Sequence, residues 1–365
     1  MSDQPPDRRS AEVKRLARAL GFDLVGIAPA VSPPGFGSFL DWLAGGNAAG
    51  MTYMHTHAEA RRHPESALEG VRSVVMVGLS YKPGTPDPPS TLRTGKVARY
   101  ARGRDYHKVL WKRLGRLKGH VEAAWPESRS RAVADTAPLL ERDYARLAGL
   151  GWIAKNTMLI HRQIGSYTVL GALLTDLDLE PDAPHESTHC GTCTRCLDAC
   201  PTDAFSAPGR LDARKCISYW TIEHRGPLPD EAEGRLHDWL FGCDICQEVC
   251  PWNRKSPPGT DPELAADPRR VAVDLVELLR SDDATIAALI RGSAMTRAKR
   301  SGLLRNAASL LESRGVADPE VLDALEQNVD DADPIVGAAC SKALATLRGV
   351  LPPQGRTIRP HPPAP

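Results

Sequence analysis

Eight of the nine cysteines lie close together in one stretch of the 365-residue chain. The first group is C-x2-C-x2-C-x3-C followed by proline, and it consists of Cys190, Cys193, Cys196 and Cys200. The second group is C-x2-C-x3-C followed by proline, with a further cysteine between the groups; its members are Cys216, Cys243, Cys246 and Cys250. Thiolates are ligands for iron and zinc, so this region could hold metal centres.

The first spacing is that of bacterial [4Fe–4S] ferredoxins, in which the fourth cysteine of a run binds the other cluster. By that crossing rule one cluster is bound by Cys190, Cys193, Cys196 and Cys250. The other is bound by Cys200, Cys216, Cys243 and Cys246. Zinc sites use C-x2-C pairs but not this continuation, and disulfides belong to oxidising compartments. The spacing therefore predicts two [4Fe–4S] clusters rather than zinc or disulfides.

The near-zero net charge indicates no particular partner, whereas the distribution of apolar residues indicates where the protein is located. Lys and Arg number 46 against 45 Asp and Glu, a formal net charge of +1. The segment Met1–Ser10 is polar and lacks the apolar core of a secretion signal. No apolar run reaches the roughly 18 residues that a membrane span needs. We expect a cytoplasmic protein with no membrane partner.

Apolar patterning predicts the elements that must position the cysteines. Predicted strands lie at 23–28, 73–80, 131–136 and 165–174, between predicted helices at 11–20, 39–43, 58–68 and 138–150. Their alternation indicates an α/β or α+β sheet domain. After Pro257 helices are predicted at 271–279, 285–290, 303–311, 319–325 and 334–347, and residues 330–344 resemble a HEAT-type helical repeat. Cys340 is read as a core residue of the last helix.

These patterns divide the chain into four predicted parts. They are a sheet domain (1–178), a ferredoxin-like cluster domain (179–258), an all-α region (259–350) and a disordered, proline-rich tail (351–365). Two basic stretches could face phosphates. Residues 93–118 hold ten basic residues against one acid, and residues 291–305 hold five and no acid. A solvated helix face would have a similar composition, so both interpretations stay open.

Asp135 ends the predicted strand at 131–136, immediately before a turn and a helix. A carboxylate at such a position can act in catalysis or simply cap the helix that follows. Nearby, Asp105 and His107 begin a D-x-H-x-x-G motif of one cobalamin-binding class, but its glycine is absent and the match is given no weight.

Taken together, residues 10–350 resemble the epoxyqueuosine reductase family. The resemblance rests on the cysteine set and on the segments 133–142, 149–156, 165–167, 216–219 and 242–251. It implies an N-terminal domain similar to the cobalamin domain of reductive dehalogenases and the nitroreductase fold, holding base-off cobalamin beside two [4Fe–4S] clusters. It also implies the last step of queuosine biosynthesis, the reduction of epoxyqueuosine to queuosine at the wobble position of tRNAs for Tyr, His, Asn and Asp. The implied partners are a tRNA anticodon stem-loop and a reductase or flavodoxin-type electron donor.

The same resemblance implies roles for individual residues. Asp135 matches the proton donor, and we expect a desolvated pocket to keep its carboxyl protonated near neutral pH. Ala98 stands where some members carry a cysteine near the cobalt, so no thiol can act there. The residues expected beside cobalamin are Arg61, Ala98, Asp135, Leu159, Leu170, Ser218 and Asp244. The residues expected at tRNA phosphates are Arg297, Lys299, Arg300 and Arg305.

Three other functions would use some of the same features. A reductive dehalogenase-like enzyme would pair the same cofactors with an organohalide, but such proteins usually carry a twin-arginine signal that this N-terminus lacks. A ferredoxin-type electron carrier with a nucleic-acid-binding module would need neither cobalamin nor Asp135. A nucleic-acid-binding protein with structural clusters would not cycle its iron.

Overall fold

The computed structural model describes residues 4–349, and its centre is a four-stranded antiparallel sheet of order β1-β2-β7-β4. The strands are β1 (Leu24–Pro29), β2 (Ser73–Ser80), β7 (Thr168–Thr175) and β4 (Ser130–Val133). Every residue of β2 is buried, as its continuous apolar run predicts for a strand covered on both faces. The predicted strands are confirmed, and their antiparallel pairing makes this an α+β sheet.

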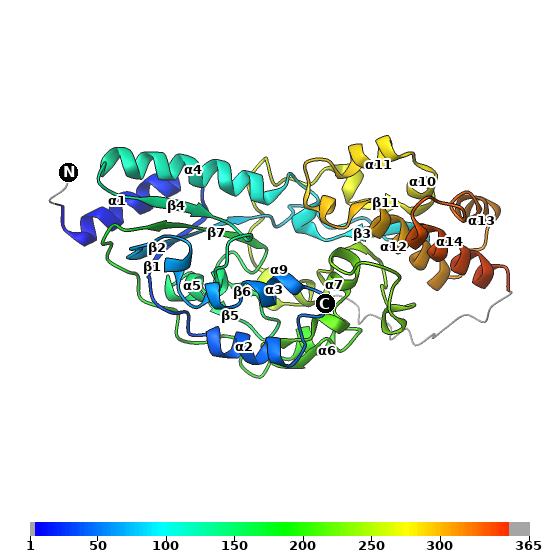
Figure 1. Ribbon diagram of the computed structural model, residues 1–365, viewed down its shortest axis with the longest axis horizontal. Helices are drawn as coiled ribbons and strands as arrows, with labels where there is room; N and C mark the ends of the chain where they lie inside the picture. Colours follow the sequence, from blue (N-terminus) through cyan, green and yellow to red (C-terminus); the bar gives the residue numbers. More distant parts are fainter. Residues whose placement is uncertain (1–3, 350–365) are drawn as a thin grey trace.

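Helices cover both faces of this sheet (Figure 1). Helices α1 (Pro6–Ala19) and α4 (Tyr106–Ala124) lie on one face and bury an apolar layer that includes Val75, Val77 and Leu114. Helix α5 (Glu141–Leu147) packs on the other face with Val74, Met76 and Leu174. Alternate residues of β2 thus belong to two different cores, because successive side chains of a strand point to opposite faces.

The predicted helix at 58–68 is wrong. The structure has a short helix α3 (Thr52–Thr56) followed by two 3-10 turns, Glu59–Arg61 and Pro64–Ser66. Pro64 explains the break, because a proline disfavours helical backbone in the residue before it, and His63 is extended. Helix α2 (Phe36–Ala44) forms as predicted, and α5 begins at Glu141 rather than at Pro138.

The cysteines lie in and between short elements joined by turns. These are the helices α6 (Arg195–Asp198), α7 (Ile217–Ile222), α8 (Ile245–Glu248) and α9 (Pro251–Arg254), with the hairpins β5 (Trp152–Ile153)–β6 (Leu159–Ile160) and β8 (Phe205–Ala207)–β9 (Arg210–Leu211). Each Cys-Pro step ends a helix or begins a new one, since proline cannot continue the hydrogen-bond ladder but fits a first turn.

A second sheet joins distant parts of the chain. Strand β3 (Thr94–Val97) pairs in parallel with β10 (Trp239–Phe241) and antiparallel with β11 (Ala272–Asp274). Residues 272–274 are therefore strand and not the predicted start of a helix. The buried core around this sheet runs from Val97 to Leu344, so the structural layers cross the predicted boundaries at 178 and 258.

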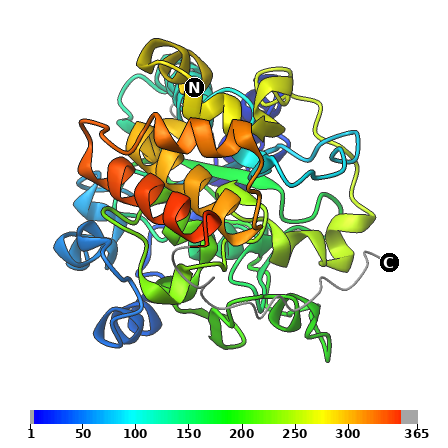
Figure 2. The same cartoon turned by 90° about the vertical axis from the view of Figure 1, so that its right-hand side faces the viewer.

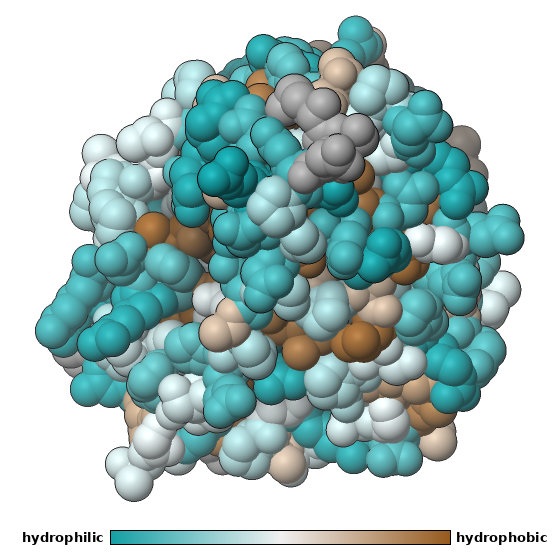
Figure 3. All heavy atoms as spheres, turned by 90° about the vertical axis from the view of Figure 1, so that its left-hand side faces the viewer, coloured by the Kyte–Doolittle hydropathy of each residue, from teal (hydrophilic) through white to brown (hydrophobic). Residues whose placement is uncertain are grey.

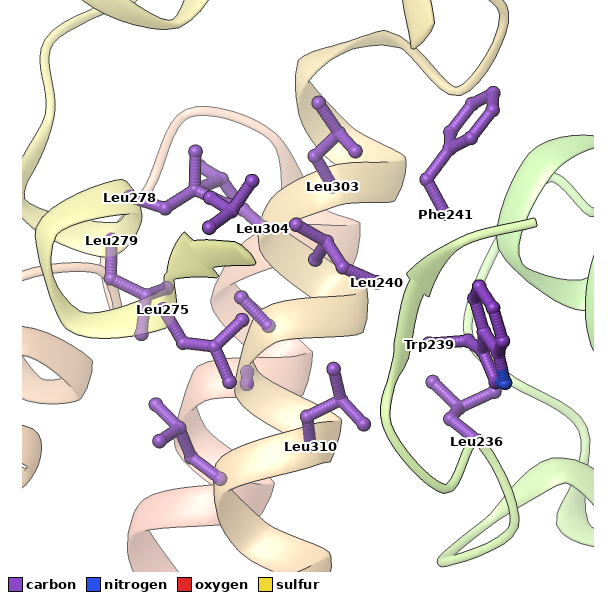
Figure 4. Close-up of a cluster of buried hydrophobic side chains, with 14 of the residues drawn as sticks. Leu236, Trp239, Leu240, Phe241, Leu275, Leu278, Leu279, Leu303, Leu304 and Leu310 are labelled. Atoms are coloured by element: carbon purple, nitrogen blue, oxygen red, sulfur yellow. The ribbon is translucent and has the colours of Figure 1, made fainter. Parts of the chain in front are cut away.

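The C-terminal helices pack against that second sheet (Figure 2). They are α10 (Leu275–Arg280), α11 (Asp283–Ile290), α12 (Lys299–Ser313), α13 (Pro319–Glu326) and α14 (Pro334–Leu347). Figure 4 shows Leu303, Leu304 and Leu310 of α12 lying between α10 and the side chains of β10. Cys340 is fully buried, which confirms it as a core residue. HEAT-type similarity stays a prediction, and the tail at 351–365 lies outside the described residues.

The described residues contain no helix long and apolar enough to cross a membrane. The end of the molecule that carries α1 and the first sheet is mainly hydrophilic at its surface, with small scattered apolar patches (Figure 3).

Candidate functional site

Asp135 lies in the loop between β4 and α5 with a left-handed backbone, at φ +55°. Such backbone is uncommon outside glycine and concentrates at functional sites. The loop is held by Glu141, whose Oε1 accepts a hydrogen bond from the Asp135 N–H at 2.7 Å. Helix α5 has Leu140 at its N-cap and no side-chain cap. The alternative that Asp135 caps this helix is therefore wrong.

The Asp135 carboxylate ends a chain of hydrogen bonds from helix α4. Its Oδ2 lies 2.9 Å from His107 Nε2 and accepts from the Tyr106 hydroxyl at 3.2 Å. His107 Nδ1 lies 2.8 Å from Asp105 Oδ1, and Asp105 also caps α4 through the His107 N–H. Both imidazole nitrogens thus face carboxylates, which favours the doubly protonated cation.

The protonation of this group differs from the expectation for Asp135. The hydrogen bond from His107 lowers the pKa of Asp135 against the effect of burial, and its side chain is 56% exposed. Burial opposes charge on His107, but Asp105 and Asp135 raise the pKa of that imidazole to about 9. The expectation of a neutral Asp135 carboxyl is wrong here, because the proton is held on His107. Burial and the Asp135 charge together raise the pKa of Glu141 to about 8.

The charge of the same carboxylate reaches three side chains from other elements. The Asp135 charge acts on the pKa values of Tyr53, Arg61 and Arg297. The Arg61 guanidinium lies 5.7 Å from the Phe39 ring centre and donates to the His57 carbonyl at 2.8 Å. Arg297 lies 5.6 Å from the ring centre of Tyr53. The fold therefore brings together Arg61, predicted for a cofactor, and Arg297, predicted for tRNA.

The thiols fall into two groups that are consistent with the crossed arrangement, which stays a prediction. Burial and then the neighbouring Cys250, Cys190 and Cys193 raise the pKa of Cys196 to about 11. Burial also raises the pKa of Cys243 and Cys246, whose further influences include Cys216 and, for Cys246, Cys200. Cys196 also acts on Cys246, so the two sets are neighbours. Within residues 4–349 no three His, Cys, Asp or Glu side chains converge as a single metal ion requires.

The loop of the β5–β6 hairpin supports both thiol sets. Lys155 Nζ donates to the carbonyls of Gly191 at 2.8 Å and Cys193 at 3.0 Å. Asn156 Nδ2 donates to the carbonyl of Cys246 at 3.2 Å. The hollow of the first set is lined by its four cysteines together with Lys155, Asn156 and Trp252. The sequence predicted no role for Lys155 and Asn156, although both lie in the segment 149–156 that contributes to the family resemblance.

The remaining predicted cofactor residues are less exposed than Asp135. Ala98 is 1% exposed and packs closely against Gly242. A Cβ added to Gly242 would lie 2.5 Å from the Cβ of Ala98. Asp244 is 1% exposed and accepts from the Arg99 N–H at 2.8 Å. Leu159 belongs to the core under α5, while Leu170 and Ser218 are half-buried. Their contacts with a cofactor stay predictions.

The four basic residues predicted for tRNA separate into two kinds. Arg297 and Lys299 are exposed, although Arg297 donates to both carboxylate oxygens of Glu223 at 2.8 Å, and Lys299 lies in a left-handed turn at the start of α12. Arg300 is held between Asp283 and Asp331, both at 2.6 Å.

Arg305 does not fit its predicted role. Its side chain is 2% exposed and donates to the carbonyls of Trp220, His224 and Gly226. A phosphate cannot reach a guanidinium that is buried and satisfied in this way, so this prediction is corrected.

The basic stretch at 93–118 is also mainly paired within the protein. Eight of its ten basic side chains form ion pairs, and these are Arg93, Lys96, Arg99, Arg102, Arg104, Lys112, Arg113 and Lys118. Most of their partners lie far away in the sequence. The stretch therefore joins elements together more than it presents charge to a phosphate.

Known proteins resemble this chain along most of its length. Residues 189–253 match the family model "4Fe-4S double cluster binding domain", and residues 61–136 match "Epoxyqueuosine reductase QueG, DUF1730". An epoxyqueuosine reductase of Gloeobacter violaceus is 45% identical over 315 residues, 84% of this chain and 97% of that protein. The chain belongs to the epoxyqueuosine reductase family. A Xanthomonas campestris member is 39% identical over 93% of this chain and 96% of its own length.

Solved structures of epoxyqueuosine reductases share the fold. One, with an epoxyqueuosine-modified tRNA-Tyr stem loop, has a TM-score of 0.86 at 30% identity and covers 93% of this chain and 90% of its own. Another, from Bacillus subtilis, has its catalytic aspartate loop swung out of the active site; its TM-score is 0.82 at 30% identity, with the same coverage. Membership in this family makes the chain an oxidoreductase with a mixed α/β fold and a [4Fe–4S] domain.

Proposed function

We propose that this chain reduces epoxyqueuosine to queuosine in tRNA. The reaction removes the epoxide oxygen as water and leaves an alkene, so it consumes two electrons and two protons. The observation that carries the proposal is the Asp135–His107–Asp105 chain of hydrogen bonds, which holds a proton beside an exposed carboxylate in a family member that also carries eight cluster-type cysteines. Family membership favours this function over an organohalide reductase or a plain electron carrier.

Cobalamin in the base-off form is the proposed cofactor at this site. The residues present suit a large, partly apolar ligand that carries amide and phosphate groups: Tyr53 is 38% exposed, and Arg61 meets a carbonyl and an aromatic ring. Ala98 offers no ligand atom for cobalt. Tyr53, Arg61 and Asp135 would hold the cofactor, with Ser218, Leu159, Leu170 and Asp244 as further predicted contacts. When bound, cobalamin supplies a low-valent cobalt that can reduce a strained carbon–oxygen bond.

The residues of the chain supply the proton for the departing oxygen. At neutral pH His107 is charged and shares its Nε2 proton with Asp135 Oδ2. As negative charge develops on the epoxide oxygen, the His107 Nε2 proton can pass to Asp135 Oδ2 and from there to that oxygen, leaving His107 neutral. Tyr106 orients the carboxylate, and Glu141 fixes the loop.

We further propose how electrons and RNA reach the site, and in which oligomeric state and compartment the protein acts. Two [4Fe–4S] clusters in the crossed arrangement deliver one electron at a time. Lys299 contacts phosphates of an anticodon stem-loop directly, and Arg297 and Arg300 do so after leaving their carboxylate partners, which for Arg297 is Glu223. We also propose a monomer in the cytoplasm that takes its electrons from a reductase or flavodoxin-type donor.

A single assay tests the function. Anaerobically purified, cluster-replete protein is mixed with cobalamin, a chemical reductant and tRNA bearing epoxyqueuosine. After digestion of the tRNA, the nucleoside masses are measured by mass spectrometry. We expect the wobble nucleoside to lose one oxygen only when cobalamin is present. Cobalamin binding without any conversion would contradict the proposed substrate, and conversion without cobalamin would contradict the cofactor.

A further inference from the structure

Lys155 lies in the loop of the β5–β6 hairpin and reaches the turn that begins the first thiol set. Its Nζ donates to the carbonyl of Gly191 at 2.8 Å and to that of Cys193 at 3.0 Å. The same turn is closed by the Cys193 N–H, which donates to the Cys190 carbonyl at 3.0 Å. Two acceptors therefore hold the ammonium group of Lys155 against the segment that bears these two thiols.

Lys155 also lines the hollow of the first thiol set, the group made of Cys190, Cys193, Cys196 and Cys250. The Lys and Arg side chains in its wall are Lys155, which is half-buried, and Arg195, which is exposed. Among the described residues this wall contains no carboxylate. The four thiols suit a [4Fe–4S] cluster, and a cluster bound by four thiolates is negatively charged. Two cations therefore lie next to the place where that negative charge would be held.

The surroundings of the second thiol set differ in charge. Asp244 lies within its C-x2-C pair, is 1% exposed and acts on the pKa of both cysteines of that pair. Arg99 Nη1 lies 3.4 Å from Asp244 Oδ2, but Arg99 also pairs with Asp87 at 2.8 Å and with Glu248 at 2.7 Å. One cation thus faces three carboxyl groups beside the second set, whereas cations alone line the first.

This difference in charge acts on electron uptake. Reduction adds an electron to a cluster that is already negative, so a nearby positive charge favours the reduced state. The effect weakens with exposure to water and salt, so the half-buried Lys155 should act more strongly than the exposed Arg195. The first cluster should therefore be easier to reduce than the second.

We propose that Lys155 raises the reduction potential of the first cluster, so that the first electron to enter the protein is held there. The cluster takes up one electron from the donor, which is oxidised by one electron, and no bond breaks. A second electron then enters the second cluster, which makes the two electrons of the reaction available together. The inference rests on the clusters of the proposed function but not on its substrate.

The test is a redox titration of cluster-replete protein without cobalamin or tRNA, followed by electron paramagnetic resonance and cluster absorbance. Dithionite supplies the electrons in the presence of redox mediators. Lys155→Met keeps a long unbranched side chain but removes its charge. It should lower the equilibrium constant of the higher-potential step about ten-fold, which corresponds to about 59 mV for a one-electron couple. Lys155→Arg retains the charge and should retain most of the potential.

Two further variants separate the effect of charge from that of structure. Arg195→Met removes the exposed cation of the same hollow, and should lower the same equilibrium constant by a smaller factor, about three-fold, that shrinks at high salt. Lys82→Met is the matched control. Lys82 Nζ also donates to two carbonyls, those of Asn253 and Ser256, but Lys82 does not line the hollow. Its loss should leave the higher-potential step unchanged.

A shift of the higher-potential step in Lys155→Met that is restored in Lys155→Arg and absent in Lys82→Met supports the proposal. An unmoved step in Lys155→Met with full iron content overturns it, as does a shift confined to the lower-potential step. An equal shift in Lys82→Met also overturns it, because the cause would then be the lost bonds to carbonyls. If Lys155→Met loses iron, Arg195→Met decides, and an unmoved step there overturns the proposal. No epoxyqueuosine is used, so a failure of the proposed substrate leaves this result unaffected.

Discussion

The Asp135 site and the cysteine region hold their reactive groups in opposite ways. Asp135 is 56% exposed and belongs to a chain of charged groups in hydrogen-bond contact. Cys243 and Cys246 are half-buried, and burial is the main cause of their raised pKa. A proton moves only between groups in contact, whereas an electron crosses packed protein. The comparison explains why one region is open and polar while the other is enclosed.

Removing a thiol should have the largest effect. We expect Cys250→Ala to damage the cluster of Cys190, Cys193 and Cys196, and Cys200→Ala to damage the cluster of Cys216, Cys243 and Cys246. Each variant should lose about half of its iron, because each cluster needs four thiolates, and all turnover with it. Iron analysis and electron paramagnetic resonance test this. Damage confined to the cluster of the sequence neighbours would refute the crossed arrangement.

Asp135→Asn tests the proton side of the comparison without touching the clusters. The amide keeps the size of the side chain and a contact with His107, but it cannot carry the proton. We expect turnover to fall about 10²–10⁴-fold, the usual range for loss of a general acid, with cobalamin still bound and with tRNA binding and iron content unchanged. Full activity in this variant would remove Asp135 from the chemistry.

The pH profile sharpens the same assignment. His107 has a pKa raised to about 9 from 6.5, so the imidazolium is present below that value and is lost as the pH rises through it. Turnover should therefore fall above about pH 9. Asp105→Asn keeps a good N-cap for α4 while removing one carboxylate from His107, and should move the upper limit to lower pH. If the upper pH limit of turnover does not move in this variant, a group other than His107 determines that limit.

The smallest effect is expected at the RNA surface. Arg297→Glu should weaken tRNA binding about ten-fold and lower the salt dependence of binding by about one ion. Arg305→Met is the matched comparison, because it removes a buried guanidinium from three carbonyls. It should lower the melting temperature and leave the salt dependence of the folded protein unchanged. A reduced salt dependence in Arg305→Met, with none in Arg297→Glu, would instead assign the phosphate contact to Arg305.

The sequence predicted well what depends on local pattern. The strand at 73–80 is found at its predicted residues because its apolar run is continuous and buried on both faces. The last helix, 334–347, also agrees, since Asp333 caps it and Pro334 begins it. Helix 58–68 failed at Pro64, where a local signal for a break was present and was outweighed by apolar spacing.

What the sequence did not reveal depends on contacts between distant residues. His107 and Asp135 meet through the packing of α4 on β4, and the D-x-H match that contains His107 lacks its glycine and so predicted no role for this residue. Arg305 has the same charge as Arg297, but buried carbonyls at 220–226 hold Arg305, whereas Arg297 is exposed and pairs with Glu223. Strand β3 is four residues long, and both of its partners lie far along the chain. The spacing of residues along a short segment does not predict burial and pairing of this kind.

Strand β3 also gives the assembly of the protein an order. It leaves the ribosome early, but it is hydrogen-bonded by β10 and β11, and its core is closed by helices near the end of the chain. Cys243 follows β10 after a single glycine. A nascent chain therefore exposes that cysteine until the last helices have been made and packed. Retention of the buried cluster then becomes a mark of a fully synthesised molecule, because incomplete chains lack the walls that enclose it.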